Sequence, residues 1–226
     1  MFVLAIDTSN KTLSVAICKN EELLVQLTEE TKNNHSSRLM PVIEAAFSQA
    51  NMRPEHIDLI AVAQGPGSYT GVRIGATVAK TLAWTLNKPL VGVSSLEVLA
   101  RNLTVKGTIV PLIDARRQTV FAGAYSDRFE AVVADGHYEL EKLLEALPEG
   151  PLHFLGDIEP YQELIANKLG SRAHYYPEKN KPQGAMAAAA ALVREPILDI
   201  HKFAPLYHRL PEAEVIWQNA QEGKNE

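Results

Sequence analysis

The chain has 226 residues, of which 46% are hydrophobic and 22% charged, and its formal net charge is −5. This balance is typical of a folded globular protein and excludes an intrinsically disordered chain. The acidic net charge argues against a protein that holds nucleic acid by itself, because such binding depends on clustered Lys and Arg. We therefore expect any RNA role to be shared with a partner.

Cysteine usage and hydropathy indicate the compartment. Cys18 is the single cysteine, so no internal disulfide forms and a reducing compartment is expected. The apolar run at 2–6 is too short for a signal peptide, and no stretch of the sequence approaches the roughly 20 residues of a membrane span. We expect a cytoplasmic protein without a membrane role.

The first half of the chain alternates strand and helix patterns. Its opening segments are apolar throughout or have period two, and later segments recur at steps of three and four. The order βββαβαβα predicts a mixed sheet with helices packed on it, opening with an antiparallel meander. The expected elements are strands at 2–6, 13–17 and 22–28, a helix at 35–50, a strand at 59–63, a helix at 70–86, a strand at 90–93 and a helix at 95–102.

Two of these helices have candidate caps. Ser36 or Ser37 is expected to cap the helix over 35–50, and Pro41 must lie near its first turn or kink it. For the helix over 70–86, Ser68 or Thr70 is the expected cap.

The second half repeats the first in outline, and we expect it to be shorter and poorer in strands. A junction at 105–107 predicts an N-terminal lobe at 1–104, a C-terminal lobe at 105–204 and a C-terminal segment at 205–226 that packs back or frays. The expected elements are a hairpin of 108–113 and 119–125, a strand at 152–155, and helices near 139–147, 160–168 and 184–194.

Two turns are candidates for phosphate binding. Asp7, Thr8 and Ser9 lie in the first hairpin turn, where actin-like and sugar-kinase-like ATPases place groups near Mg-bound phosphates. These residues are also ordinary turn formers, so a polar turn is the alternative. The second turn joins a strand to a helix but lacks the Walker and dinucleotide fingerprints, so a tight turn competes there with an anion site. Its residues are Gly65, Pro66, Gly67, Ser68, Thr70 and Arg73.

The helix over 70–86 carries a row of small residues and is apolar over most of its circumference. Such a row predicts the close approach of another helix, which is either the helix over 35–50 or a helix of a partner subunit. The predicted interface residues are Leu39, Val42, Ile43, Gly71, Gly75, Val78, Ala79 and Leu82.

Catalytic signatures are missing from the sequence. The seven histidines form no His-x-x-x-His pair, and there is no Gly-x-Ser-x-Gly elbow. Arg116 and Arg117 at a hairpin tip indicate a solvated turn, with a phosphate contact as the alternative. We expect no catalytic residue and no metal site.

Five blocks stand out along the chain: residues 5–9, His35-Ser36 with Leu39 and Pro41, residues 65–75, residues 113–117 and residues 205–209. In this order they resemble the bacterial TsaB (YeaZ) family. The resemblance implies an α/β, two-lobed fold of the actin, sugar kinase and Hsp70 (ASKHA) superfamily, with mixed sheets flanked by helices and a reduced second lobe. It also implies a role in making threonylcarbamoyladenosine beside the tRNA anticodon.

The same resemblance implies a noncatalytic subunit. Its catalytic relative, TsaD, carries a metal-binding His-x-x-x-His after the strand equivalent to 90–93, where Ser95 and Leu99 stand here. Ile158 replaces a common second glycine, which argues against nucleotide binding in the interlobe cleft. The implied function is a scaffold and activator that pairs with TsaD and TsaE and contacts tRNA through the complex. For the chain alone, a monomer and a homodimer are the two alternatives.

No intrinsic cofactor is expected, and ATP or ADP is expected at most at a shared interface. The alternative is an ATP-using small-molecule kinase or a metal-dependent hydrolase of the same fold, which Asp7 favours.

Overall fold

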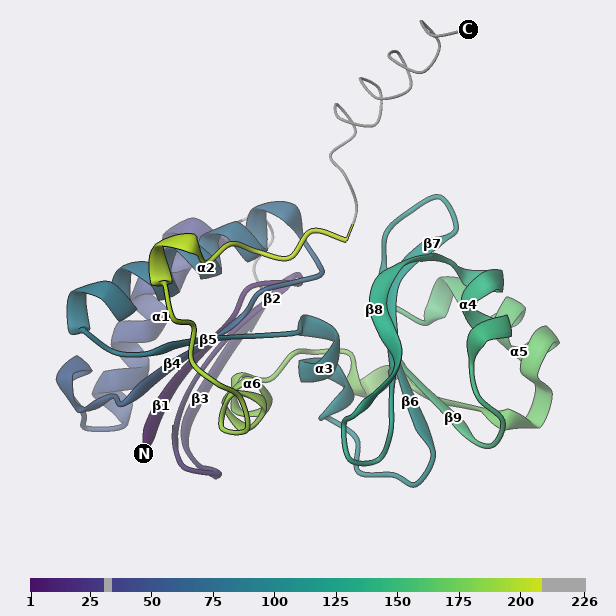
Figure 1. Cartoon of the computed structure of the whole chain (residues 1–226), viewed down its shortest axis with the longest axis horizontal. Helices are drawn as coiled ribbons and strands as arrows, with labels where there is room; N and C mark the ends of the chain where they lie inside the picture. The colour runs from purple at the N-terminus through teal and green to yellow at the C-terminus, as the bar shows by residue number, and fades with distance from the viewer. Residues whose placement is uncertain (31–33, 209–226) are drawn as a thin grey trace, which may run out of the picture.

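The computed structural model describes residues 1–30 and 34–208, and it places their strands in two mixed sheets (Figure 1). The first sheet has the order β3-β2-β1-β4-β5; β1 to β3 form the predicted antiparallel meander, and β4 and β5 run parallel to β1. Its strands are β1 (Phe2–Asp7), β2 (Thr12–Lys19), β3 (Glu22–Glu30), β4 (Leu59–Ala63) and β5 (Leu90–Val93).

Helices cover both faces of the first sheet, which explains why β1 is apolar without alternation. Leu4 and Ile6 pack in the cluster that includes α1 and α2, whereas Val3 and Ala5 pack on the opposite face with α6. Among the described residues, no helix combines the length and apolarity needed to span a bilayer. The helices are α1 (His35–Gln49), α2 (Tyr69–Leu86), α3 (Ser95–Ala100), α4 (Leu140–Ala146), α5 (Gln162–Leu169) and α6 (Gly184–Ala191).

The starts of α1 and α2 test the predicted caps. The cap residue of α1 is Asn34, whose side chain makes no capping hydrogen bond, so the prediction of Ser36 or Ser37 is wrong. Pro41 lies in the second turn of α1. The α2 prediction is confirmed at Ser68, whose hydroxyl oxygen accepts a hydrogen bond from the backbone N–H of Gly71 at 3.2 Å.

The helix α6 packs on the first sheet, although its place in the sequence suggested the second lobe. The backbone N–H of Gly184 donates to the Ser14 hydroxyl at 2.9 Å, and a Cβ on Gly184 would lie 2.8 Å from the Ala16 nitrogen. Small side chains let this alanine-rich helix approach the strands closely. The boundaries predicted at residues 104 and 204 stay predictions, because packing here does not follow chain order.

The second sheet also has five strands, in the order β10-β9-β6-β7-β8, so the expectation of a strand-poor second half is wrong. The two strands absent from the prediction, β8 and β10, are the edge strands, and their residues are half-buried or exposed without a clear apolar alternation. The strands are β6 (Thr108–Asp114), β7 (Thr119–Tyr125), β8 (Ala131–Glu139), β9 (Leu152–Gly156) and β10 (Ala173–Tyr176).

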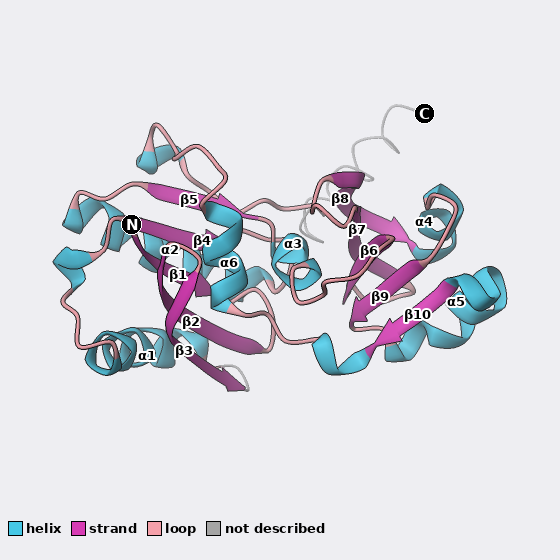
Figure 2. Ribbon diagram, turned by 90° about the horizontal axis from the view of Figure 1, so that it is seen from below, coloured by secondary structure: helices cyan, strands magenta, loops and turns pink. Residues whose placement is uncertain are grey.

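One helix and a group of hydrogen bonds connect the two sheets. α4 and α5 pack on one face of the second sheet and α3 on the other, so α3 lies between the lobes (Figures 1 and 2). Ser94, which caps α3, donates its hydroxyl hydrogen to Asp135 on β8. The Tyr125 hydroxyl donates to the same carboxylate at 2.5 Å. Burial raises the pKa of Asp135, and these two hydroxyls partly oppose that shift.

Candidate functional site

A cleft of about 1110 Å³ separates the lobes on one side of the molecule. The first β-hairpin turn and the start of α2 form one wall, and the ends of β6 and β9 form the other. Strand ends and helix starts leave backbone and polar side-chain groups exposed, so groups that can bind a ligand are accessible in this cleft. The lining includes Ser9, Asn10, Lys11, Ser68, Tyr69, Thr70, Asp114, Arg116, Phe121, Asp157, Glu159 and Tyr207.

Of the three hairpin candidates, only Ser9 lines this cleft. Asp7 and Thr8 are fully buried, and the Thr8 hydroxyl donates to the Gly71 carbonyl at 2.8 Å. Asp7 Oδ1 accepts from the backbone N–H and the hydroxyl of Ser9, at 2.8 and 2.7 Å. Asp7 Oδ2 has no hydrogen-bond partner among the described residues. Burial raises the pKa of Asp7 to about 6, and the Ser9 bonds partly oppose the shift.

The glycine turn locks the first hairpin to α2. Gly65 and Gly67 have φ values of 112° and 153°, and the Ser68 N–H donates to the Ser9 carbonyl at 2.7 Å. A Cβ on Gly67 would overlap that same carbonyl oxygen. The glycines therefore permit contact within the chain, which favours the tight-turn interpretation. Pro66, Thr70 and Arg73 continue the turn and the first turns of α2, and Thr70 and Arg73 are exposed.

The second-lobe wall contains acidic residues that the sequence analysis did not single out. Asp157 Oδ2 accepts from the backbone N–H of Asp114 at 3.0 Å. Asp114 Oδ1 accepts from the Tyr161 hydroxyl at 2.6 Å and from the Arg116 N–H at 2.8 Å. Burial first, and hydrogen bonding to Asp114 second, raise the pKa of Tyr161. The sequence feature that could have identified Asp114 and Asp157 is their position at the ends of β6 and β9, which are neighbouring parallel strands.

The Asp7 carboxylate is fully buried and does not line the cleft, whereas the second-lobe wall presents the carboxylates of Asp114, Asp157 and Glu159. No group of three or more His, Cys, Asp or Glu within the described ranges is placed to hold a metal ion.

The predicted interface residues divide into buried and accessible sets. Gly71, Gly75 and Ala79 face the chain's own sheet: a Cβ on Gly71 or Gly75 would overlap Thr8, and Ala79 is fully buried. Assigning this row to a partner is therefore wrong. The side chains of Leu39, Val42 and Ile43 are also buried, at 1–2% exposed, because α1 turns them toward the sheet.

An apolar groove of about 510 Å³ lies between α1 and α2. Leu82, which is half-buried, and the edge of Ile43 line it. Val78 is half-buried on the same helix. Met40 and Pro41 contribute exposed apolar surface, which the sequence analysis missed because it followed the buried stripe. The other lining residues are Glu44, Phe47 and Pro54.

Comparison with known proteins identifies the family. The family model described as "TsaD: tRNA N6-adenosine threonylcarbamoyltransferase" matches residues 27–217. The tRNA threonylcarbamoyladenosine biosynthesis protein TsaB of Bacillus subtilis is 40% identical over 229 residues, covering 98% of this chain and 100% of that protein. The chain belongs to the TsaB (YeaZ) family. The resemblance inferred from the sequence blocks is thereby confirmed.

Solved structures agree with a TsaB-family fold. A Pseudomonas aeruginosa protein described as similar to peptidase YEAZ has a TM-score of 0.80 and 25% identity, covering 92% of this chain and 99% of that one. A ROK hexokinase from Thermus thermophilus has a TM-score of 0.53 at 12% identity, covering 85% and 98%. The second match concerns the fold alone and confirms the two-lobed sugar-kinase-like architecture.

Proposed function

We propose that this chain is a noncatalytic subunit for the synthesis of threonylcarbamoyladenosine in tRNA, and that it acts by pairing with TsaD. The name and full-length similarity of the Bacillus subtilis relative support the process. The observation that carries the pairing is the apolar groove between α1 and α2. We expect the complex to recruit TsaE and tRNA in the cytosol.

The accessible rim of the groove suits a helical partner. Met40 is 48% exposed at its edge, and Pro41 and Leu82 supply further apolar surface. Burying such a patch releases water from apolar surface, which drives association. Without TsaD, the same groove pairs two copies of this chain. The α1–α2 surface of one copy then faces the α1–α2 surface of the other, and twofold symmetry makes the two surfaces complementary.

The site residues support a noncatalytic role. Ser95 and Leu99, which hold the positions implied for the metal-binding histidines of TsaD, are each 1% exposed and lie in α3 between the lobes. The burial of Asp7 likewise supports placing any ATP or ADP requirement at an interface shared with the partner. Asp7 was the residue that favoured the kinase or hydrolase alternative, and its burial outside the cleft weakens that alternative.

Met40→Glu tests the pairing. A carboxylate in the groove rim must be buried against an apolar partner, so the affinity for TsaD should fall at least about tenfold, measured by calorimetry. In cells depleted of the protein, the parent chain should restore threonylcarbamoyladenosine to bulk tRNA, measured by nucleoside mass spectrometry, and Met40→Glu should not.

Val193→Glu is the matched control, because Val193 is 75% exposed after α6 and away from the groove. The unfolding free energy of each variant should lie within about 1 kcal/mol of the parent's value, because substitutions of surface residues change stability little. Unchanged affinity for TsaD in Met40→Glu would refute the groove as the contact. If depletion of the protein leaves the level of threonylcarbamoyladenosine in tRNA unchanged, the proposed function itself is refuted.

A further inference from the structure

We propose that the mouth of the interlobe cleft binds single-stranded RNA directly. The inference rests on the proposed function, because it assigns to this subunit a contact with the unpaired loop of the RNA that the complex modifies. Its starting point is a cluster of exposed aromatic and cationic groups where the cleft opens, near the start of α2.

The aromatic part of this cluster consists of the rings of Tyr69 and Tyr207, and the guanidinium group of Arg73 lies against both rings. The Tyr69 and Tyr207 ring centroids lie 5.4 Å apart, and the Arg73 guanidinium carbon lies 4.1 Å from the first and 5.5 Å from the second. Arg73 Nε donates to the Tyr207 hydroxyl at 2.7 Å. The tyrosines remain 48% and 43% exposed. Flat, solvent-facing rings held in place in this way are surfaces on which bases stack.

The cationic part consists of Lys11, Arg73 and Arg116. Lys11 and Arg116 line the cleft from the first hairpin turn and from the β6–β7 loop. None of the three forms an ion pair with an acidic residue in the described part of the chain. Three unneutralised cations around one opening attract a chain of phosphates, in contrast to the net charge of −5 over the whole molecule.

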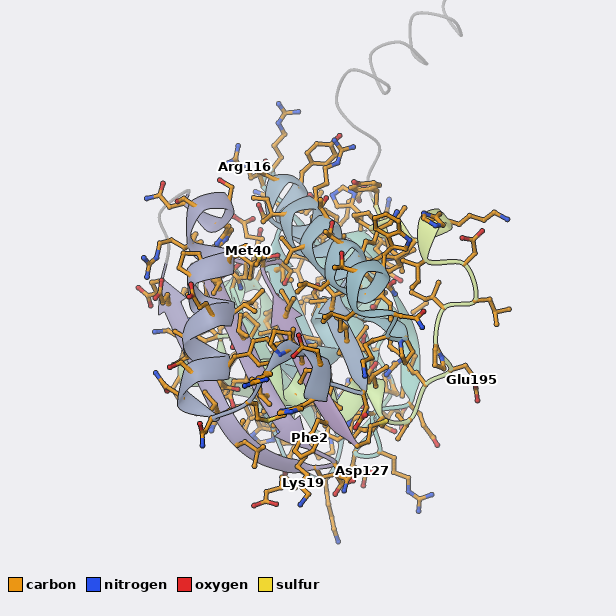
Figure 3. The ribbon with its side chains drawn as sticks, turned by 90° about the vertical axis from the view of Figure 1, so that its left-hand side faces the viewer. Phe2, Lys19, Met40, Arg116, Asp127 and Glu195 are labelled. Atoms are coloured by element: carbon orange, nitrogen blue, oxygen red, sulfur yellow. The ribbon has the colours of Figure 1, made fainter. Side chains whose placement is uncertain are left out.

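The backbone that presents Arg116 supports a role for this residue. Arg116, Arg117 and Gln118 have φ values of 67°, 52° and 59°, a left-handed conformation that costs free energy in each non-glycine residue. The Asp114 carboxylate accepts the Arg116 N–H and helps to hold this turn. The turn directs the Arg116 side chain away from the core, at the end of the molecule where α2 begins (Figure 3).

The opposite wall and the size of the cleft indicate the class of RNA. Asp157 and Glu159 line the second-lobe wall, and carboxylates accept hydrogen bonds from the exocyclic amino groups of bases. A volume of about 1110 Å³ exceeds the roughly 300–1,000 Å³ of small-molecule pockets. The cleft mouth is therefore suited to several unpaired nucleotides in sequence, as in an RNA loop, and not to a duplex.

Fluorescence anisotropy with the full-length protein tests the proposal. The probes are a labelled single-stranded RNA of anticodon-loop length and an unmodified tRNA transcript, at salt from about 20 to 200 mM. With three phosphate contacts, log K should fall with log salt with a slope of about −2. Tyr69→Ala and Tyr207→Ala should each weaken binding about tenfold at unchanged slope. Lys11→Gln and Arg116→Gln should each reduce the slope by about 0.7.

Two controls match these substitutions. Lys19→Gln removes a cation at the end of the molecule opposite Arg116 (Figure 3), and Trp84→Ala removes an aromatic ring that is 67% exposed near the far end of α2. Both should bind as the parent does. Absence of binding at the lowest salt overturns the proposal, as do cleft variants that match the parent. Displacement of the probe by AMP at the affinity of the RNA also overturns it, because it indicates a mononucleotide site.

The RNA test does not depend on the partner. Loss of RNA binding in the cleft variants with intact pairing to TsaD supports the inference and the proposed function together. If the cleft variants lose RNA while the parent fails to pair with TsaD, the proposed function fails and the RNA site stands. If pairing holds and RNA binding is unaffected, only the RNA site fails.

Discussion

Asp7 is a fully buried carboxylate with one oxygen atom, Oδ2, that lacks a partner among the described residues. Its pKa in the folded chain is about 6, against an ordinary value of 3.8. Between these values the folded state binds more protons than the unfolded state, so stability falls as the pH rises from about 4 to 6. Ionised Asp7 therefore lowers the stability at neutral pH by about 3 kcal/mol.

Asp7→Asn should remove this pH dependence while keeping an acceptor for Ser9. The difference in unfolding free energy between variant and parent should shift by about 3 kcal/mol in favour of the variant between pH 4 and pH 7. Urea denaturation at both pH values measures it, with exposed Asp127→Asn as the control (Figure 3). Parallel pH profiles for Asp7→Asn and the parent would contradict the assignment.

At the scale of elements, the packing of α2 on β1 depends on Gly71. Replacing glycine by alanine within a helix usually stabilises it by about 1 kcal/mol. Here the new Cβ overlaps the Thr8 carbonyl oxygen, so Gly71→Ala should instead lower the unfolding free energy by about 1–3 kcal/mol. Thr77→Ala, on the exposed face of α2, should change it by less than about 0.5 kcal/mol. Equal or greater stability of Gly71→Ala in urea would show that the helix does not approach β1 this closely.

The elements that could be predicted from the sequence are those whose burial leaves a local pattern. β1, β4 and α2 have continuous or periodic apolar residues, and each was predicted within a few residues. Edge strands β8 and β10 lack such a pattern because neither face is fully covered. The partner of α6 could not be predicted either, since a helix of glycine, methionine and alanine has no distinct apolar face.

The candidate site was less accessible to sequence reasoning. The order of residues located the Asp7 turn and the glycine turn, but only the fold shows which of these groups faces the cleft. Ser9 lines the cleft and Asp7 does not, although both residues are buried. Tyr69 and Tyr207 are 138 positions apart in the chain numbering and meet only because residues 205–208 return to α2. The structure describes this segment to residue 208, and its remainder lies outside the described residues. The expectation that 205–226 packs back or frays therefore stays a prediction.

At the scale of the whole molecule, the two lobes should unfold together. Ser94 donates to Asp135 across the lobe boundary, and Tyr125 donates to the same carboxylate from β7, the strand beside β8. Buried Glu97 on α3 forms ion pairs with Arg101 at 2.9 Å and with Arg194 beyond α6. We expect one calorimetric transition for the parent. Asp135→Ala leaves two hydroxyl groups without their acceptor, a loss of about 1–3 kcal/mol at the boundary.

In Asp135→Ala, the van't Hoff enthalpy should fall below the calorimetric enthalpy as the lobes begin to melt separately. Glu130→Ala removes an exposed carboxylate just before β8 and should melt as the parent does. A single cooperative transition in Asp135→Ala, unchanged from the parent, would show that the hydrogen bonds at β8 do not couple the lobes.

The return of α6 to the first sheet has a consequence for synthesis on the ribosome. The strands β1 to β5 are complete after Val93, yet one face of their sheet is covered only once Ala191 has been translated and has left the exit tunnel. At about 5–20 residues per second, that face stays bare for many seconds. A nascent chain stalled within the second lobe therefore presents an apolar sheet surface to other proteins, and chaperone binding should peak over this interval.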